Sequence, residues 1–144
     1  MLVTTTEFGF MKSGEIYVTL EAAKKLKEAG FDSTVMARYE KNGDGEYEIK
    51  VETEAKNWNE KEGDDVISCP SLYYAVFWCR MNGFFYITTE FEEDMQRFLF
   101  NIKRLDTGAS TDSFDLEDDE IESTYSTPEE AMDVAIRVVT DKYM

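Results

Sequence analysis

The chain has 144 residues, 42% of them apolar and 14% aromatic, which is enough for a hydrophobic core without disulfides or a structural metal. It contains no histidine, so Ser-His and Cys-His nucleophiles and the commonest metal ligand are excluded. The net charge of −16 disfavours direct contact with nucleic acid or an anionic membrane and favours a basic protein partner. Two cysteines, no long apolar run and no pattern of a secretion signal predict a cytoplasmic protein without membrane association.

The sequence repeats itself. When Ala23 is aligned with Ala75 and Ala131, three helix starts coincide, and the first two copies continue in step as far as a pair of alternating apolar runs. Internal repeats indicate repeated supersecondary units. We therefore expect one α+β domain over residues 1–144, of order αββ–αββ–α, whose strands form an antiparallel sheet with the helices packed on one face. Its parts are repeat units at about 19–56 and 71–105, an acidic loop at 106–123 and a closing helix at 127–142.

The first copy predicts a helix from about Leu20 to Ala29, with Thr19 as its N-cap and Gly30 as a left-handed C-cap. A hairpin follows, with its turn at Asn42-Gly43-Asp44-Gly45 and a loop at 56–63. One face of this hairpin is expected to be apolar and consists of Val35, Ala37, Tyr39, Tyr47, Ile49 and Val51.

The second copy begins with a helix at about 71–82 that has almost no polar face, which is typical of a core helix or an interface, and we expect Trp78 to be buried. Residues 92–104 suit either a helix or part of a hairpin, and the repeat favours a hairpin that turns at 92–96. Thr127 and Pro128 then start the closing helix, with Glu130 placed for a capping box. Short strand-like pieces precede the helices at 16–18, 66–68 and 124–126.

Three runs of the sequence resemble a known family of proteins. They are Leu26-Lys27-Glu28-Ala29-Gly30-Phe31-Asp32, then Ile67-Ser68-Cys69-Pro70-Ser71-Leu72 with Ala75, Trp78 and Arg80, and Tyr125-Ser126-Thr127-Pro128-Glu129-Glu130-Ala131 with Ala135-Ile136. On these runs the chain resembles small uncharacterised proteins of prophages and mobile elements in gut Bacteroidetes, and departs from them at Cys79 and in its enlarged acidic loop. The resemblance implies a mobile-element setting and no established reaction.

No motif predicts catalysis, a cofactor or a metal. Cys69 and Cys79 lie in apolar stretches that disfavour a thiolate, so both are expected to be structural. Asp115, Glu117 and Asp119 have the alternating spacing of an EF-hand loop. However, Glu120 stands where that loop needs glycine, and Ser126 stands where it needs a bidentate glutamate. We therefore expect a protein that is not an enzyme.

Most of the excess charge lies late in the chain, where residues 106–144 hold twelve acids and two bases. We expect a non-enzymatic binding protein of a phage or mobile element, whose acidic surface occupies a basic site on a host protein. The most specific form of this hypothesis is inhibition of a nucleic-acid-handling defence enzyme by charge mimicry. Duplex DNA carries one charge per roughly 1.7 Å of axis, and a dense run of acids could compete with it for the same basic groove. The candidate partner-binding residues are Asp112, Asp115, Glu117, Asp118, Asp119, Glu120 and Glu122.

Three alternatives stay open. The acidic loop could be a disordered, solubilising insertion, because such blocks of charge commonly stay unfolded. The chain could instead bind or sequester a small ligand in an aromatic pocket, or be a structural accessory subunit that assembles through the helix at 71–82 or through a sheet edge, and homo-oligomerisation is open. The residues of the aromatic pocket would be Tyr73, Tyr74, Phe77 and Trp78.

Overall fold

The computed structural model describes residues 15–116, 118 and 120–144, which form an α+β fold with three α-helices and two antiparallel sheets. The chain divides into two compact units, residues 1–74 and 75–144. Our expectation of a single sheet is wrong for the described residues. Each hairpin takes its third strand from the segment that directly follows it, which completes a separate three-stranded sheet in each unit.

The first unit has a sheet of order β2-β1-β3. Its central strand, β1, pairs antiparallel with both neighbours. The elements of this unit are α1 (Leu20–Glu28), β1 (Val35–Lys41), β2 (Tyr47–Lys56), a short 3-10 helix η1 (Trp58–Glu60) and β3 (Val66–Ser68).

The second unit has a sheet of order β4-β5-β6 with β5 in the centre. The boundary between the units falls after Tyr74, inside α2. The elements here are α2 (Leu72–Gly83), β4 (Phe85–Glu92), β5 (Arg97–Arg104), β6 (Ser110–Asp112), α3 (Pro128–Val138) and a π-helix η2 (Val139–Tyr143).

The predicted helix caps are confirmed. The Thr19 hydroxyl accepts a hydrogen bond from the Ala22 N–H at 3.3 Å, and Gly30 adopts a φ of +95° just past the end of α1. Thr127 does the same for α3, accepting from the Glu130 N–H at 3.1 Å with Pro128 at the first helical position. These side chains satisfy backbone donors that a helix leaves unpaired at its start.

The first hairpin is confirmed, except at Val51. The Asn42 side-chain oxygen accepts hydrogen bonds from the N–H groups of Asp44 and Glu46, at 2.9 and 3.1 Å, and so closes the turn. Val51 was expected to face the core but is 43% exposed. The register shifts at this point, because Ala37 pairs with Val51 while Val35 pairs with Lys56, so β2 bows away from β1 between them.

One lysine fixes the connection between η1 and β3. The Lys27 ammonium on α1 donates hydrogen bonds to the carbonyl oxygens of Lys61, Gly63 and Val66. The distances to Lys61 and Val66 are 2.8 and 3.0 Å. The three carbonyls converge on one cation, so the loop is tied to the helix that packs on β3.

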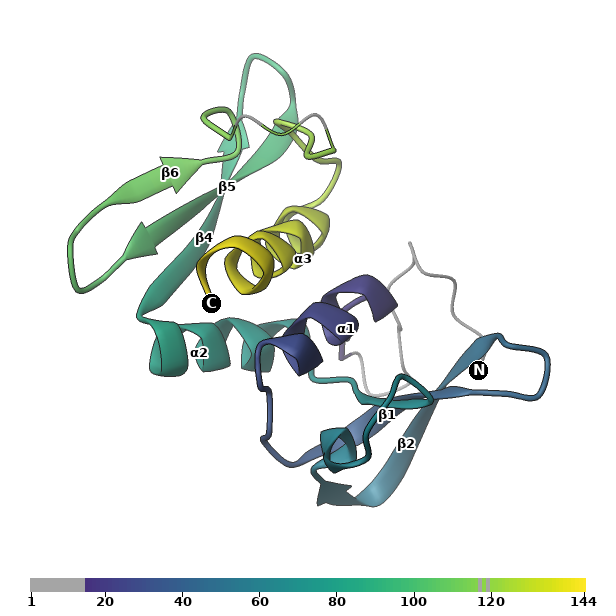
Figure 1. Ribbon diagram of the computed structural model, residues 1–144. Coiled ribbons are helices and arrows are strands. Elements are labelled where there is room, and N and C mark those ends of the chain that lie inside the picture. The colour runs from purple at the N-terminus through teal and green to yellow at the C-terminus, as the bar shows by residue number, and fades with distance from the viewer. Residues whose placement is uncertain (1–14, 117, 119) are drawn as a thin grey trace. The chain divides into compact units, whose positions relative to one another are not determined.

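The second hairpin is confirmed and the helical alternative for residues 92–104 is wrong. Strands β4 and β5 pair continuously from Phe85 with Arg104 to Glu92 with Arg97, around a turn at 93–96. Figure 1 shows α3 lying against these two strands. Each unit thus contains a helix, a hairpin and a third strand, and α3 follows the second set, whereas the predicted order had two strands after each helix. The superposition of the two copies stays a prediction.

The predicted acidic loop at 106–123 contains a strand that we did not expect. In β6, residues 110–112 pair with residues 101–103 of β5. The strand was missed because it is three residues long and polar, with no apolar alternation. Of the short pieces predicted before the helices, 66–68 is β3, while Tyr17 and Tyr125 each form a single bridge, to Ser71 and Phe98.

Trp78 is buried, as predicted, with 6% of its surface exposed. We expect Trp78→Ala to lower the free energy of unfolding by about 3–5 kcal/mol, the usual loss for removing a large aromatic side chain from a core. Denaturant unfolding followed by circular dichroism measures it. Trp58→Ala is the matched control, because Trp58 is half-buried and should cost less. Equal losses in the two variants would contradict a core role for Trp78.

Candidate functional site

Two of the predicted partner-binding acids have structural roles. The Asp112 carboxylate accepts hydrogen bonds from the N–H groups of Phe114 and Asp115, at 2.9 and 3.1 Å, and so closes the turn after β6. Asp118 forms an ion pair with Lys142 at 2.9 Å. The hydrogen bond from Lys142 lowers the pKa of the Asp118 carboxyl, and the backbone of Glu120 adds to this effect. Both carboxylates stabilise the segment itself.

Three other acids point to solvent. Asp115, Glu120 and Glu122 are exposed, and none of them makes an ion pair with another described residue. Glu117 and Asp119 lie outside the described residues. The structure thus places three of the seven predicted acids where a partner could reach them as unpaired charges.

The segment that carries these acids is held at both ends. At its start, the Ser113 N–H donates to the Phe100 carbonyl of β5 at 3.0 Å, and the buried Ser113 hydroxyl donates to the Ser123 carbonyl at 2.6 Å. At its end, Tyr125 and Phe98 exchange two backbone hydrogen bonds of 2.7 and 2.8 Å. Fixed ends reduce the conformational entropy that the segment would lose on binding a partner.

The four residues of the alternative aromatic pocket do not share one direction. Tyr73 is 71% exposed and Trp78 is buried, so they lie on different sides of α2. Tyr74 lies edge-on to Phe31, with ring centroids 6.1 Å apart. It also lines a hollow of about 260 Å³ in the first unit, together with Tyr17 and other residues. The aromatic pocket stays a prediction, and one side of α2 is exposed.

The exposed side of α2 ends in an unusual turn. Phe84, just past the helix, has a φ of +62°, a conformation that normally takes glycine, and its ring is 55% exposed. Glycine stands one residue earlier, because a Cβ at Gly83 would lie 2.7 Å from the ring of Phe85. The buried Phe85 ring therefore needs Gly83, and the left-handed position falls to Phe84.

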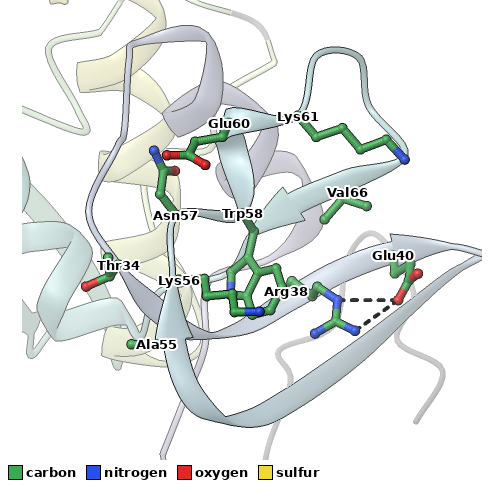
Figure 2. Close-up of a pocket in the computed structure, with 10 residues that line it drawn as sticks. All are labelled: Thr34, Arg38, Glu40, Ala55, Lys56, Asn57, Trp58, Glu60, Lys61 and Val66. Atoms are coloured by element: carbon green, nitrogen blue, oxygen red, sulfur yellow. Dashed lines mark hydrogen bonds and ion pairs between the residues drawn. The ribbon is translucent and has the colours of Figure 1, made fainter.

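The first unit has a groove that the sequence did not predict. It encloses about 680 Å³, and Figure 2 shows Trp58 at its centre with Arg38 and Lys56 beside it. The Arg38 guanidinium lies 4.4 Å and the Lys56 ammonium 5.5 Å from the centre of an indole ring, which are cation–π distances. The indole N–H donates to the Val35 carbonyl at 2.8 Å. The sequence feature that could have indicated this groove is Trp58 itself, a tryptophan among polar residues.

Two of the charged residues in this groove, Arg38 and Glu40, form ion pairs. Arg38 pairs with Glu52 at 2.7 Å and with Glu40 at 3.3 Å, and Lys50 reaches Glu40 at 3.0 Å. The hydrogen bond from Lys50 is the main cause that lowers the pKa of the Glu40 carboxyl. With its guanidinium engaged by two carboxylates, Arg38 holds the sheet face together.

Neither cysteine has the setting of a nucleophile. Cys69 is fully buried, and burial raises the pKa of the Cys79 thiol to about 12. Because reactivity needs the thiolate, we expect neither to react with a thiol reagent such as DTNB at pH 8, and both to react in denaturant. Rapid labelling of the folded protein would contradict this prediction, and mass spectrometry of the labelled peptides would identify the residue.

No protein-family model, curated protein or solved structure matches the chain. The resemblance to proteins of prophages and mobile elements therefore stays a prediction. Across residues 15–116, 118 and 120–144, no helix combines the length and the apolar character needed to cross a membrane. The same residues contain no group of three or more acids and cysteines placed to hold a metal ion.

Proposed function

We propose that this chain is a non-enzymatic binding protein whose acidic segment, residues 112–122, occupies a basic site on a protein partner. The observation that carries the proposal is that Asp115, Glu120 and Glu122 are exposed and form no ion pair with a described residue, on a segment fixed at both ends. Exposed carboxylates on a segment whose ends are fixed would give electrostatic complementarity and fast association with a positively charged groove.

The partner class follows from the density of charge. Residues 117–122 contain five acids in six positions, and duplex DNA carries one charge per roughly 1.7 Å of axis. A groove of Arg and Lys that binds a nucleic-acid backbone would attract such a segment. We therefore infer a nucleic-acid-handling protein as the partner, and the resemblance to mobile-element proteins favours a host defence enzyme whose groove the segment blocks.

The test neutralises the exposed acids of the segment. The variant Asp115→Asn/Glu120→Gln/Glu122→Gln should retain much less basic protein from a host lysate at low salt than the unmodified chain, because its ionic contacts are lost. A matched control, Glu54→Gln/Glu62→Gln/Glu90→Gln, removes three exposed acids that have no ion pair with a described residue. Its net charge is the same, so it separates a specific surface from overall charge.

Salt and duplex DNA test whether the partner's site is a nucleic-acid groove. Retention by the unmodified chain should fall as salt rises and should be displaced by duplex DNA, since both compete for the same basic groove. If the segment variant and the control retain the same proteins equally, the acidic segment is not the binding surface. If retention is unaffected by DNA, the partner's site is not a nucleic-acid groove.

A further inference from the structure

The groove on the first unit has the size of a small-molecule site and lies where β2 bows away from the sheet. Between the pairs Ala37–Val51 and Val35–Lys56, four residues of β2 stand opposite one residue of β1. Strands β1, β2 and β3 and the turn η1 all contribute to the lining, which belongs entirely to the first unit. Its volume of about 680 Å³ is typical of ligand sites.

The indole ring in this groove is fixed by the protein itself. The Trp58 N–H donates to the Val35 carbonyl at 2.8 Å. The turn η1 is capped by the Asn57 side chain, which accepts from the Asn59 N–H at 3.1 Å, and the Asn59 side chain accepts from the Ser68 N–H of β3 at 2.9 Å. Because Trp58 is half-buried, part of its surface stays open. A ligand that packs on a ring already held in place loses little conformational entropy.

Two lysines of the groove have no carboxylate partner among the described residues. Lys56 ends β2 and Lys61 follows η1, so they flank Trp58 in the chain, and both are exposed. The Lys56 ammonium lies 5.5 Å from the indole ring. With Arg38, the lining contains three cations and two acids, an excess of positive charge in a chain whose net charge is −16. The groove therefore favours an anion.

We propose that this groove binds a small aromatic phosphate ester such as a mononucleotide, with its ring against the Trp58 indole and its phosphate held by Lys56 and Lys61. Ammonium groups bind phosphate as point charges, whereas a planar carboxylate is matched best by a free guanidinium. The Arg38 guanidinium is engaged by carboxylates of the sheet. A phosphate monoester carries a charge of about −2 at neutral pH, which two ammonium groups balance.

The charge of the whole chain favours a small ligand over a nucleic acid. Every phosphate of a polynucleotide adds to its repulsion by a net charge of −16, whereas a mononucleotide places its single phosphate in the groove. The rim also carries the exposed Glu60 carboxylate, which makes no ion pair with a described residue. A carboxylate only accepts hydrogen bonds, so Glu60 suits the hydroxyl or amino groups of a nucleotide.

Isothermal titration calorimetry of the full-length chain with AMP tests the proposal. We expect a Kd of roughly 1 mM or below at low salt. Adenosine, which lacks the phosphate, and inorganic phosphate, which lacks the ring, should each bind roughly tenfold more weakly or worse. Benzoate tests an aromatic carboxylate in the same way. Absence of binding by AMP and UMP up to about 10 mM would overturn the proposal, and so would equal binding of AMP and inorganic phosphate.

Substitution of the lysines locates the phosphate. Lys56→Gln/Lys61→Gln should weaken AMP binding roughly tenfold or more, because both ammonium groups are lost. Lys41→Gln/Lys103→Gln is the matched control, because it removes two exposed lysines outside the groove, and Lys41 also lies beside an aromatic ring, at 5.8 Å. The control should bind AMP normally. Equal weakening in the two variants would overturn the site, and circular dichroism checks that both fold.

The two tryptophans of the chain report where the ring of the ligand lies. Trp58 and Trp78 each give one indole N–H signal in the NMR spectrum, and Trp58→Phe assigns them. AMP should shift the Trp58 signal and leave that of the buried Trp78 in place. A shift of the Trp78 signal alone would place the ligand elsewhere and overturn the proposal.

The groove and the acidic segment can be tested separately. The variant Asp115→Asn/Glu120→Gln/Glu122→Gln changes no residue of the groove lining, so it should bind AMP at least as well as the unmodified chain. Lys56→Gln/Lys61→Gln should in turn retain basic proteins normally. A single-stranded oligonucleotide should bind more weakly than AMP at low salt, because the acidic chain repels it. Tighter binding of the oligonucleotide would overturn the proposal and make the groove part of a nucleic-acid surface.

Discussion

The position of the acidic segment depends on the edge of strand β5 that does not pair with β4. A central strand must satisfy its backbone hydrogen bonds on both sides, and β4 covers only one of them. The other side is completed by β6, by Ser113 and by Tyr125, which lie on both flanks of the acidic segment. Arg97 adds hydrogen bonds from its guanidinium to Thr124, at 2.9 and 3.2 Å. The strand pairing of an ordinary sheet thereby fixes both flanks of the acidic segment.

The chain also separates its charge by region. The acids at 112–122 are concentrated on one segment, while residues 66–89 contain none and include the exposed apolar side of α2. On the first sheet, the carboxylate of Glu40 is neutralised locally by Lys50 and Arg38. A polyanionic protein can therefore present two surfaces of opposite physical character, one governed by long-range electrostatics and the other by burial of apolar area.

Local signals in the sequence predicted much of the fold. Thr19, Asn42 and Thr127 act on backbone groups within a few residues, so their roles could be recognised from spacing alone. What was missed depends on distant parts of the chain. Strand β6 exists because β5 offers it an edge, and the exposure of Val51 follows from a register shift. The groove around Trp58 requires β1, β2 and η1 together, which no local pattern encodes.

The three carbonyl oxygens around Lys27 have a consequence for the chemistry of the loop after η1. Convergent carbonyls in an acid-rich turn are the ligand set that hard divalent cations prefer, and this loop contains Glu60, Glu62, Asp64 and Asp65. Here the cation is a side chain of α1, covalently tethered and always present. The loop is therefore held by an ammonium group that belongs to the chain itself, in the place that a bound metal ion takes in a calcium-binding turn.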